Sequence, residues 1–165
     1  MAGTPDLKVV WTDADFEQMG WHDNRVHGLS FEDDGEDARL LLDIDYIVRW
    51  IEPEPPAEYF TFMIAPATLV FEGVEYLEGG IVAGDGGTRT ALIIEGLDPP
   101  TPEPEHGSRT DLRRWDFVGH NFELSFLALG FHQHFRMRPI HVVGEQFLSR
   151  EQRDGISFAT PSEWR

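Results

Sequence analysis

Two histidines stand in the alternating spacing of a β-strand, in which side chains two positions apart share a face. His132 and His134 would lie with their Cα atoms about 6.5–7 Å apart, and two imidazoles at that spacing can bind one metal ion. Arg136 and Arg138 continue the same face, and their charges disfavour a divalent cation nearby. A His-x-His metal site of the cupin type would also need a Glu a few residues later, and Glu145 is too distant to match. We therefore predict no metal, with the two histidines as the candidate ligands, and favour a half-exposed polar face.

Two aspartates show the same spacing on another predicted strand. Asp43 and Asp45 would share its polar face, where paired carboxylates could act as acid and base or as metal ligands. Arg49 is expected on that face too and could neutralise one of them. If this strand lay beside the strand of the histidine pair, the aspartates would face the two imidazoles and Arg136. Such an arrangement would be either an ion-pair network or a functional site, and the sequence leaves both alternatives open.

A third candidate is the dipeptide His22-Asp23. Asp23 could hold a histidine tautomer, as in hydrolytic triads, or it could cap a turn through Asn24 and Arg25, which is the interpretation we favour. The chain has no Gly-x-Ser-x-Gly string and no Cys, which disfavours acyl transfer. The glycine-rich string at residues 84–87 lacks a following lysine and helix, so we predict a hairpin turn there and not a phosphate loop.

The elements that must position these residues are mainly strands. The clearest pattern is the alternation of large apolar residues at Leu40, Leu42, Ile44, Tyr46, Val48 and Trp50, which predicts one long strand with these side chains in the core. Further strands are predicted over residues 6–11, 25–32, 59–64, 68–71, 88–95, 111–118 and 122–137. We expect Pro66 to break the sheet at a bulge or an edge, and a face switch predicts a bend near Ala128–Gly130.

Turns and short helices complete the pattern. Thr12 to Asp15 resembles a capping box and predicts a short helix over Asp13–Met19, and a second helical turn capped by Ser149 is predicted within Gln146–Asp154. Gly79-Gly80 is predicted to be a turn, and the proline-rich stretch Leu97–Ser108 an exposed loop. We therefore predict one mainly β domain over residues 1–165: an antiparallel sandwich or partly open barrel of about 8–9 strands with one or two short helices.

Several short strings along the chain are distinctive when they are taken together. They are Trp21-His22-Asp23, Asp43-Ile44-Asp45-Tyr46-Ile47 with Trp50, Ile64-Ala65-Pro66-Ala67-Thr68-Leu69-Val70-Phe71, Gly130-Phe131-His132-Gln133 with Arg136, Arg138 and Pro139, and Gln146-Phe147-Leu148-Ser149 with Arg153. Across most of residues 16–153 they resemble a family of small uncharacterised bacterial proteins, to which no activity is assigned, so the resemblance implies no catalytic roles. His22-Asp23 and the β-rich pattern also resemble, over fewer residues, small immunity-type proteins that neutralise toxins.

The charge is large and unevenly distributed. The formal net charge is -17, and residues 1–107 carry 23 acidic and 5 basic side chains, whereas residues 108–165 carry 7 and 8. Solubility is the simplest explanation, but such a field also repels nucleic acid and anionic lipid and could attract a basic protein. The absence of Cys, a polar start at Met1–Leu7 and the shortness of the apolar stretch Phe60–Ala67 predict a cytoplasmic chain with no membrane contact.

Three functions fit these observations. The hypothesis we favour is a non-catalytic, immunity-like binding module that engages a basic protein through its acidic surface. The second is a metal-dependent or acid–base enzyme that uses Asp43, Asp45, His132 and His134. The third is a small-ligand carrier. Four aromatic side chains are expected in the core, although an open barrel could leave some of them lining a ligand cavity; they are Tyr46, Trp50, Phe60 and Phe62. No cofactor is predicted, and strand edges could also pair two copies into a homodimer.

Overall fold

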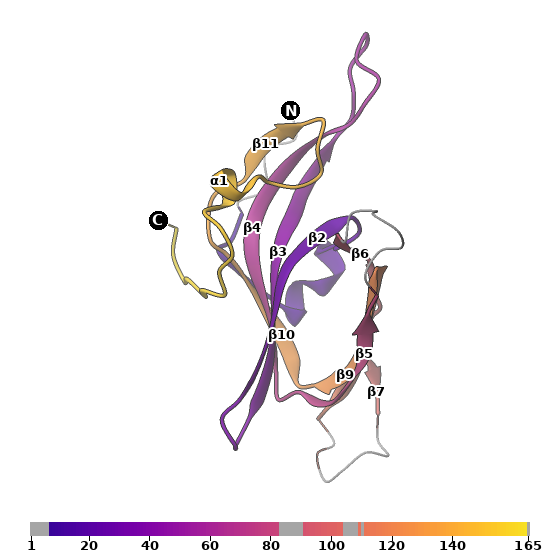
Figure 1. Ribbon diagram of the computed structural model, residues 1–165, viewed down its shortest axis with the longest axis vertical. Coiled ribbons are helices and arrows are strands. Elements are labelled where there is room, and N and C mark those ends of the chain that lie inside the picture. Colours follow the sequence, from indigo (N-terminus) through magenta and orange to yellow (C-terminus); the bar gives the residue numbers. More distant parts are fainter. Residues whose placement is uncertain (1–6, 83–90, 104–108, 110, 165) are drawn as a thin grey trace.

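The computed structural model describes residues 7–82, 91–103, 109 and 111–164, which form a single antiparallel sheet with two short helices (Figure 1). The strands are β1 (Val10–Thr12), β2 (Asn24–Asp33), β3 (Ala38–Ile51), β4 (Thr61–Glu72), β5 (Glu75–Ile81), β6 (Leu92–Leu97), β7 (Thr101–Pro102), β8 (Arg113–His120), β9 (Phe122–Ala128), β10 (Gly130–Phe135) and β11 (Ile140–Val143). The helices are η1 (Asp13–Gln18), a 3-10 helix, and α1 (Arg150–Arg153).

The sheet curls over on itself without closing. Its strand order is β1-β10-β4-β3-β2-β6-β8-β9-β5, with β11 beside β4 and β7 beside β8. Phe71 of β4 nevertheless contacts Trp115 of β8 and Phe126 of β9, with ring centroids 5.2 and 4.8 Å apart. The two halves of the sheet therefore face one another across one aromatic core (Figure 1). This confirms the predicted antiparallel, mainly β fold, as a partly open barrel with eleven described strands.

The alternation in β3 is confirmed from Leu40 to Val48, which packs against the main core, and is wrong at Trp50. Leu42, Ile44 and Tyr46 are buried on the inner face, the face that lines the main core. A register shift between Ile47 and Arg49 then inserts one residue, and an inserted residue moves every following side chain to the opposite face. Trp50, predicted to lie in the core, is instead 40% exposed opposite Phe62 on the outer face.

Pro66 does not break its strand, contrary to the sequence prediction. It lies inside β4, and its carbonyl oxygen accepts a hydrogen bond from the Arg136 N–H at 2.9 Å. The nitrogen and the carbonyl of one residue point to the same side of a strand, so the missing N–H of Pro66 points towards β10 and β11. There β10 ends at Phe135 and β11 begins only at Ile140, so no ladder hydrogen bond is lost.

The predicted strand over residues 122–137 is two strands. The bend predicted near Ala128–Gly130 lies where β9 ends and β10 begins, and the Leu129 N–H bonds to the Glu72 carbonyl at 2.9 Å. Gly79-Gly80, predicted to be a turn, pairs with β9 instead. Glycine is needed there because β9 comes so close that a Cβ on Gly79 would lie 2.1 Å from a backbone oxygen.

Other predicted segments fall partly outside the described residues. The turn predicted at residues 84–87 and the start of the strand predicted at 88–95 lie there, and so do residues 104–108 of the predicted loop. Within that loop, β7 pairs with β8. Both predicted helices are present, and the Ser149 hydroxyl caps α1 by accepting the Gln152 N–H at 3.2 Å.

The C-terminal segment, residues 144–164, covers the outer face of β3, β4 and β10 (Figure 1, yellow). It is fixed by polar contacts along its length, including Thr68 Oγ1 to the Ala159 carbonyl at 2.7 Å and Ser157 N–H to Asp43 at 3.0 Å. A smaller apolar cluster that includes Phe62, Ile64 and Leu148 lies under its first part. Within the described ranges, no helix is both long enough and apolar enough to cross a membrane.

The two edges of the sheet are short or irregular. β1 spans three residues, and β5 has a register shift between Glu75 and Glu78 and a positive φ of 144° at Gly79. Bulges of this kind twist an edge away from regular pairing. Edge-to-edge association into a homodimer stays a prediction that these strands support only weakly.

Candidate functional site

Asp43 is fully buried on the outer face of β3, and both of its carboxylate oxygens are occupied. Oδ1 accepts hydrogen bonds from Arg136 Nη2 and Arg153 Nη2, each at 2.6 Å. Oδ2 accepts from Arg153 Nη1 at 2.9 Å and from the Ser157 N–H at 3.0 Å. The bidentate arginine contact has the geometry that makes ion pairs strong.

Asp45 is equally buried and shares the same arginine. Its Oδ1 accepts from Arg153 Nε at 3.1 Å, and its Oδ2 lies 2.7 Å from His27 Nε2 and 2.9 Å from the Leu148 N–H. All four carboxylate oxygens of Asp43 and Asp45 thus have hydrogen-bond partners within the protein, and none is left to contact a substrate. We call Asp43, Asp45, Arg136 and Arg153 the ion network, and it fastens the C-terminal segment to the sheet.

The ion network forms although its strands are not neighbours. β4 lies between β3 and β10, and Arg136 reaches Asp43 across it, with a hydrogen bond to Thr68 Oγ1 at 2.9 Å on the way. Arg49 does not supply a donor to either aspartate, because the register shift leaves it exposed beyond them. Sequence reasoning missed Arg153. Two aspartates on one face of a strand indicate that a cation lies nearby, but the sequence does not show which of its 13 lysines and arginines that is.

The ion network predicts an acid-sensitive contribution to stability. Burial acts to raise the pKa of Asp45, but the hydrogen bond and charge of His27, the Leu148 N–H and the charge of Arg153 outweigh it and hold that pKa below its usual value. A carboxyl whose pKa is lower in the folded state stabilises the fold above the unfolded-state pKa, about 3.9, and that stabilisation is lost as the pH falls through the folded-state pKa.

We therefore expect the free energy of unfolding to fall between pH 5 and pH 2 with a share from Asp45 of up to about 1.4 kcal/mol per pH unit. Urea unfolding at several pH values would measure it, with Asp45→Asn as the test and the exposed Asp111→Asn as the matched control. The free energy of unfolding should depend less steeply on pH in Asp45→Asn than in the wild type or in Asp111→Asn. A curve parallel to the wild type would contradict this assignment.

The histidine pair lies on β10 within a chain of hydrogen bonds. His132 Nδ1 lies 2.6 Å from His134 Nε2, His132 Nε2 lies 2.8 Å from Glu72 Oε1, and His134 Nδ1 lies 2.8 Å from the Pro161 carbonyl oxygen. Burial and the neighbouring His132 lower the pKa of His134, against the opposing effect of the Pro161 carbonyl. All four ring nitrogens are engaged, and among the described residues no cluster of three or more potential ligands has metal-binding geometry.

His22 and Asp23 lie apart from the ion network, in a turn at the start of β2. Asp23 has a positive φ of 64°, its N–H bonds to the Ile94 carbonyl at 2.8 Å, and its Oδ2 lies 3.2 Å from His22 Nδ1. The exposed His22 ring lies against Trp50, with centroids 6.5 Å apart. Left-handed backbone in a residue other than glycine is uncommon and tends to occur at functional positions.

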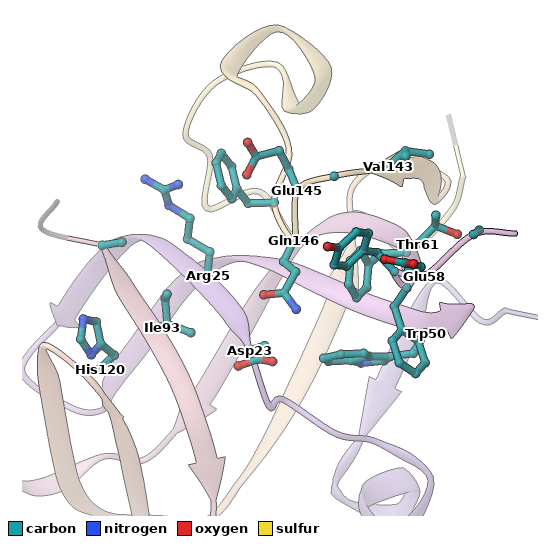
Figure 2. Close-up of a pocket in the computed structure, with 17 residues that line it drawn as sticks. Asp23, Arg25, Trp50, Glu58, Thr61, Ile93, His120, Val143, Glu145 and Gln146 are labelled. Atoms are coloured by element: carbon teal, nitrogen blue, oxygen red, sulfur yellow. The ribbon is translucent and has the colours of Figure 1, made fainter. Parts of the chain in front are cut away.

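An open pocket of about 940 Å³ lies beside this turn on the outer face (Figure 2). Its aromatic wall consists of Trp50, Tyr59, Phe60 and Phe62, and the first three are 40%, 80% and 43% exposed. Exposed aromatic side chains gathered around one hollow are unusual on a protein surface and mark binding sites. The size lies within the range of small-ligand sites.

The charged side chains around the pocket are mostly acidic. Asp23, Glu58 and Glu145 line it, against one arginine, Arg25. The Arg25 guanidinium lies over the Phe147 ring, 4.3 Å from its centroid. The pocket therefore combines an aromatic wall with an excess of negative charge.

The ion network also positions one wall of the pocket. Gln146 and Phe147 line the pocket, and the next residue, Leu148, donates its N–H to Asp45. Arg153 then ties the following helix to both aspartates. The buried aspartates thus act on the pocket as positioning residues, without facing it.

The sequence indicated only part of this pocket. Trp50, Phe60 and Phe62 were expected in the core, with a ligand cavity as the alternative, and His22-Asp23 was singled out without a connection to them. The aromatic residues and Asp23 line one pocket because of the register shift in β3 and the path of the C-terminal segment.

In comparisons with known proteins, no family model, no curated protein and no solved structure matches the chain.

Proposed function

We propose that this protein is a non-catalytic binding module for a basic protein, and that the pocket with the β3–β4 hairpin forms its binding surface. The observation that carries the proposal is the exposed aromatic wall bounded by carboxylates. Aromatic side chains are enriched at protein interfaces, and Trp and Tyr are prominent among the few residues that carry most of the binding energy. A surrounding charge of one sign speeds the encounter with an oppositely charged partner.

The hairpin is suited to contact a partner. It projects beyond the rest of the sheet (Figure 1), and its connecting residues include exposed Glu52, Glu54 and Glu58 next to Tyr59 and Phe60. Three prolines lie in the same connection, and proline restricts the backbone. A restricted loop loses less conformational entropy on binding, which favours affinity.

A catalytic role is less well supported by the same residues. The aspartates of the enzyme hypothesis are saturated by arginine and backbone donors, and the ring nitrogens of the histidine pair are engaged with one another, Glu72 and Pro161. A general acid or base must reach the proton that it transfers. A small-ligand carrier is the second candidate, and the pocket volume favours it.

Selection from a displayed library of random peptides tests the proposal without a known partner. We expect the immobilised protein to enrich peptides that contain arginine or lysine beside apolar residues. Their binding should weaken at least about fivefold in Phe60→Ala, because an aromatic anchor that becomes buried at an interface is commonly worth more than about 1 kcal/mol. Isothermal calorimetry on synthesised peptides measures the loss.

The matched control is Phe31→Ala, which removes a phenylalanine of similar exposure, 52% against 43%, that does not line this pocket. Phe31→Ala should bind the selected peptides like the wild type. Peptides that bind both variants equally well, or a library that enriches no binder, would count against the pocket as a protein-binding surface.

A further inference from the structure

We propose that the end of the pocket formed by Trp50 and Asp23 is a subsite for one organic cation, of the guanidinium class, and that a basic side chain of the partner occupies it. This inference rests on the proposed function and specifies its chemistry. A cation gains from the face of an aromatic ring and from a carboxylate at the same place.

The Trp50 ring is held firmly and still presents surface. Phe62 and Phe60 contact it at centroid distances of 5.0 and 5.9 Å, with interplanar angles of 79° and 77°. These nearly perpendicular neighbours fix the plane of the indole, and 40% of the residue stays exposed. A preorganised ring of this kind binds a flat cation with little loss of conformational entropy.

Asp23 supplies the counter-charge. Its carboxylate contacts His22 in this structure, and the His22 side chain is 69% exposed, so an incoming guanidinium can displace it. The Asp23 backbone is fixed by the hydrogen bond to Ile94, and its side chain is only 28% exposed, so solvent screens it less than a free surface carboxylate. Figure 2 shows Asp23 and Trp50 in the lower part of the pocket, with the Gln146 amide pointing down towards Asp23. His22 lies next to both, since its Nδ1 is 3.2 Å from Asp23 Oδ2 and its ring centroid is 6.5 Å from that of Trp50. An indole face, a carboxylate and an amide match a planar group that carries several N–H donors.

The arginine that lines the pocket does not fill this subsite. The Arg25 guanidinium lies on Phe147, and Figure 2 shows its side chain extending away from Asp23 and Trp50. Glu58 and Glu145 add negative charge at the rim. An anionic ligand would meet three carboxylates, so a cation is the better match.

Titration of the full chain with defined probes tests the subsite. The probes are an acetylated and amidated Gly-Arg-Gly peptide, its neutral citrulline counterpart and n-butylguanidinium, and the readout is the indole N–H signal of Trp50 in ¹H–¹⁵N spectra, assigned with Trp50→Phe. We expect the arginine peptide to shift that signal and the citrulline peptide to bind at least about threefold more weakly.

Asp23→Asn is the matched variant, because asparagine also accepts a left-handed backbone. It should weaken the arginine peptide by about three- to tenfold and leave the citrulline peptide unchanged, whereas the distant Asp111→Asn should change neither. Stronger binding of the peptide than of n-butylguanidinium indicates a protein side chain as the natural occupant. Equal binding indicates a free small cation.

Two results would overturn the subsite. One is equal affinity for the arginine and citrulline peptides, and the other is equal behaviour of Asp23→Asn and Asp111→Asn. The proposed function would still stand in either case if peptides selected from the library lose affinity in Phe60→Ala. Failure of the subsite and failure of the binding surface can therefore be distinguished.

Discussion

Replacing Arg153 with Ala should lower the free energy of unfolding by about 3–5 kcal/mol at pH 7, because it leaves two buried carboxylates without their main counter-charge. Arg153 donates three hydrogen bonds to Asp43 and Asp45 and is almost fully buried. Arg136 would still contact Asp43 and His27 would still contact Asp45, but neither bridges the two carboxylates as Arg153 does. Urea or guanidinium unfolding, followed by tryptophan fluorescence, measures the change.

The matched control lies in the same helix. Arg150 is exposed at the first position of α1, so Arg150→Ala removes an equal charge from the same segment and should cost less than about 0.5 kcal/mol. Arg153→Lys should recover only part of the loss, because one ammonium cannot reproduce the fork of bonds to both aspartates. Equal stability of the two alanine variants would show that the ion network contributes nothing to folding.

The sequence left open whether Asp43 and Asp45 belong to an ion-pair network or to a functional site, and the structure shows an ion-pair network. Asp43, Asp45 and Arg136 do meet, and they form ion pairs that hold the C-terminal segment against the sheet. The sequence could supply the aspartates, because their alternation with apolar residues was clear. It could not supply Arg153, because the pairing depends on how a segment more than a hundred residues away returns to β3.

The fold was more predictable than the site, for a physical reason. Alternation in β3 and the turn signals around it depend on neighbours in sequence, and they predicted β3 and the mainly β fold correctly. Irregularities are decided by partners across the sheet: Pro66 stays within β4 because β10 and β11 leave a gap beside it, and Trp50 leaves the core because of a register shift. The pocket depends on that shift, so local patterns could not place it.

Replacing Phe71 with Ala should cost about 3–5 kcal/mol, because Phe71 is fully buried at the centre of the aromatic core. Its ring contacts four others, those of Trp115, Phe117, Phe126 and Phe131, at centroid distances between 4.8 and 5.9 Å. Phe31→Ala, at a 52% exposed position, should cost less than about 0.5 kcal/mol by the same unfolding measurement. A loss below about 1 kcal/mol at Phe71 would contradict its place in the core.

A double-mutant cycle turns this prediction into a test of how the sheet curls. Four strands lie between β4 and β9 in the strand order, so Phe71 and Phe126 meet only if the sheet folds over. We expect Phe71→Leu and Phe126→Leu to couple by about 0.5–1.5 kcal/mol, the usual range for an edge-to-face aromatic pair. Additive effects would imply a flatter sheet. The curl encloses the aromatic core, and this leaves the opposite face of β3 and β4 to carry the C-terminal segment, which forms one wall of the pocket.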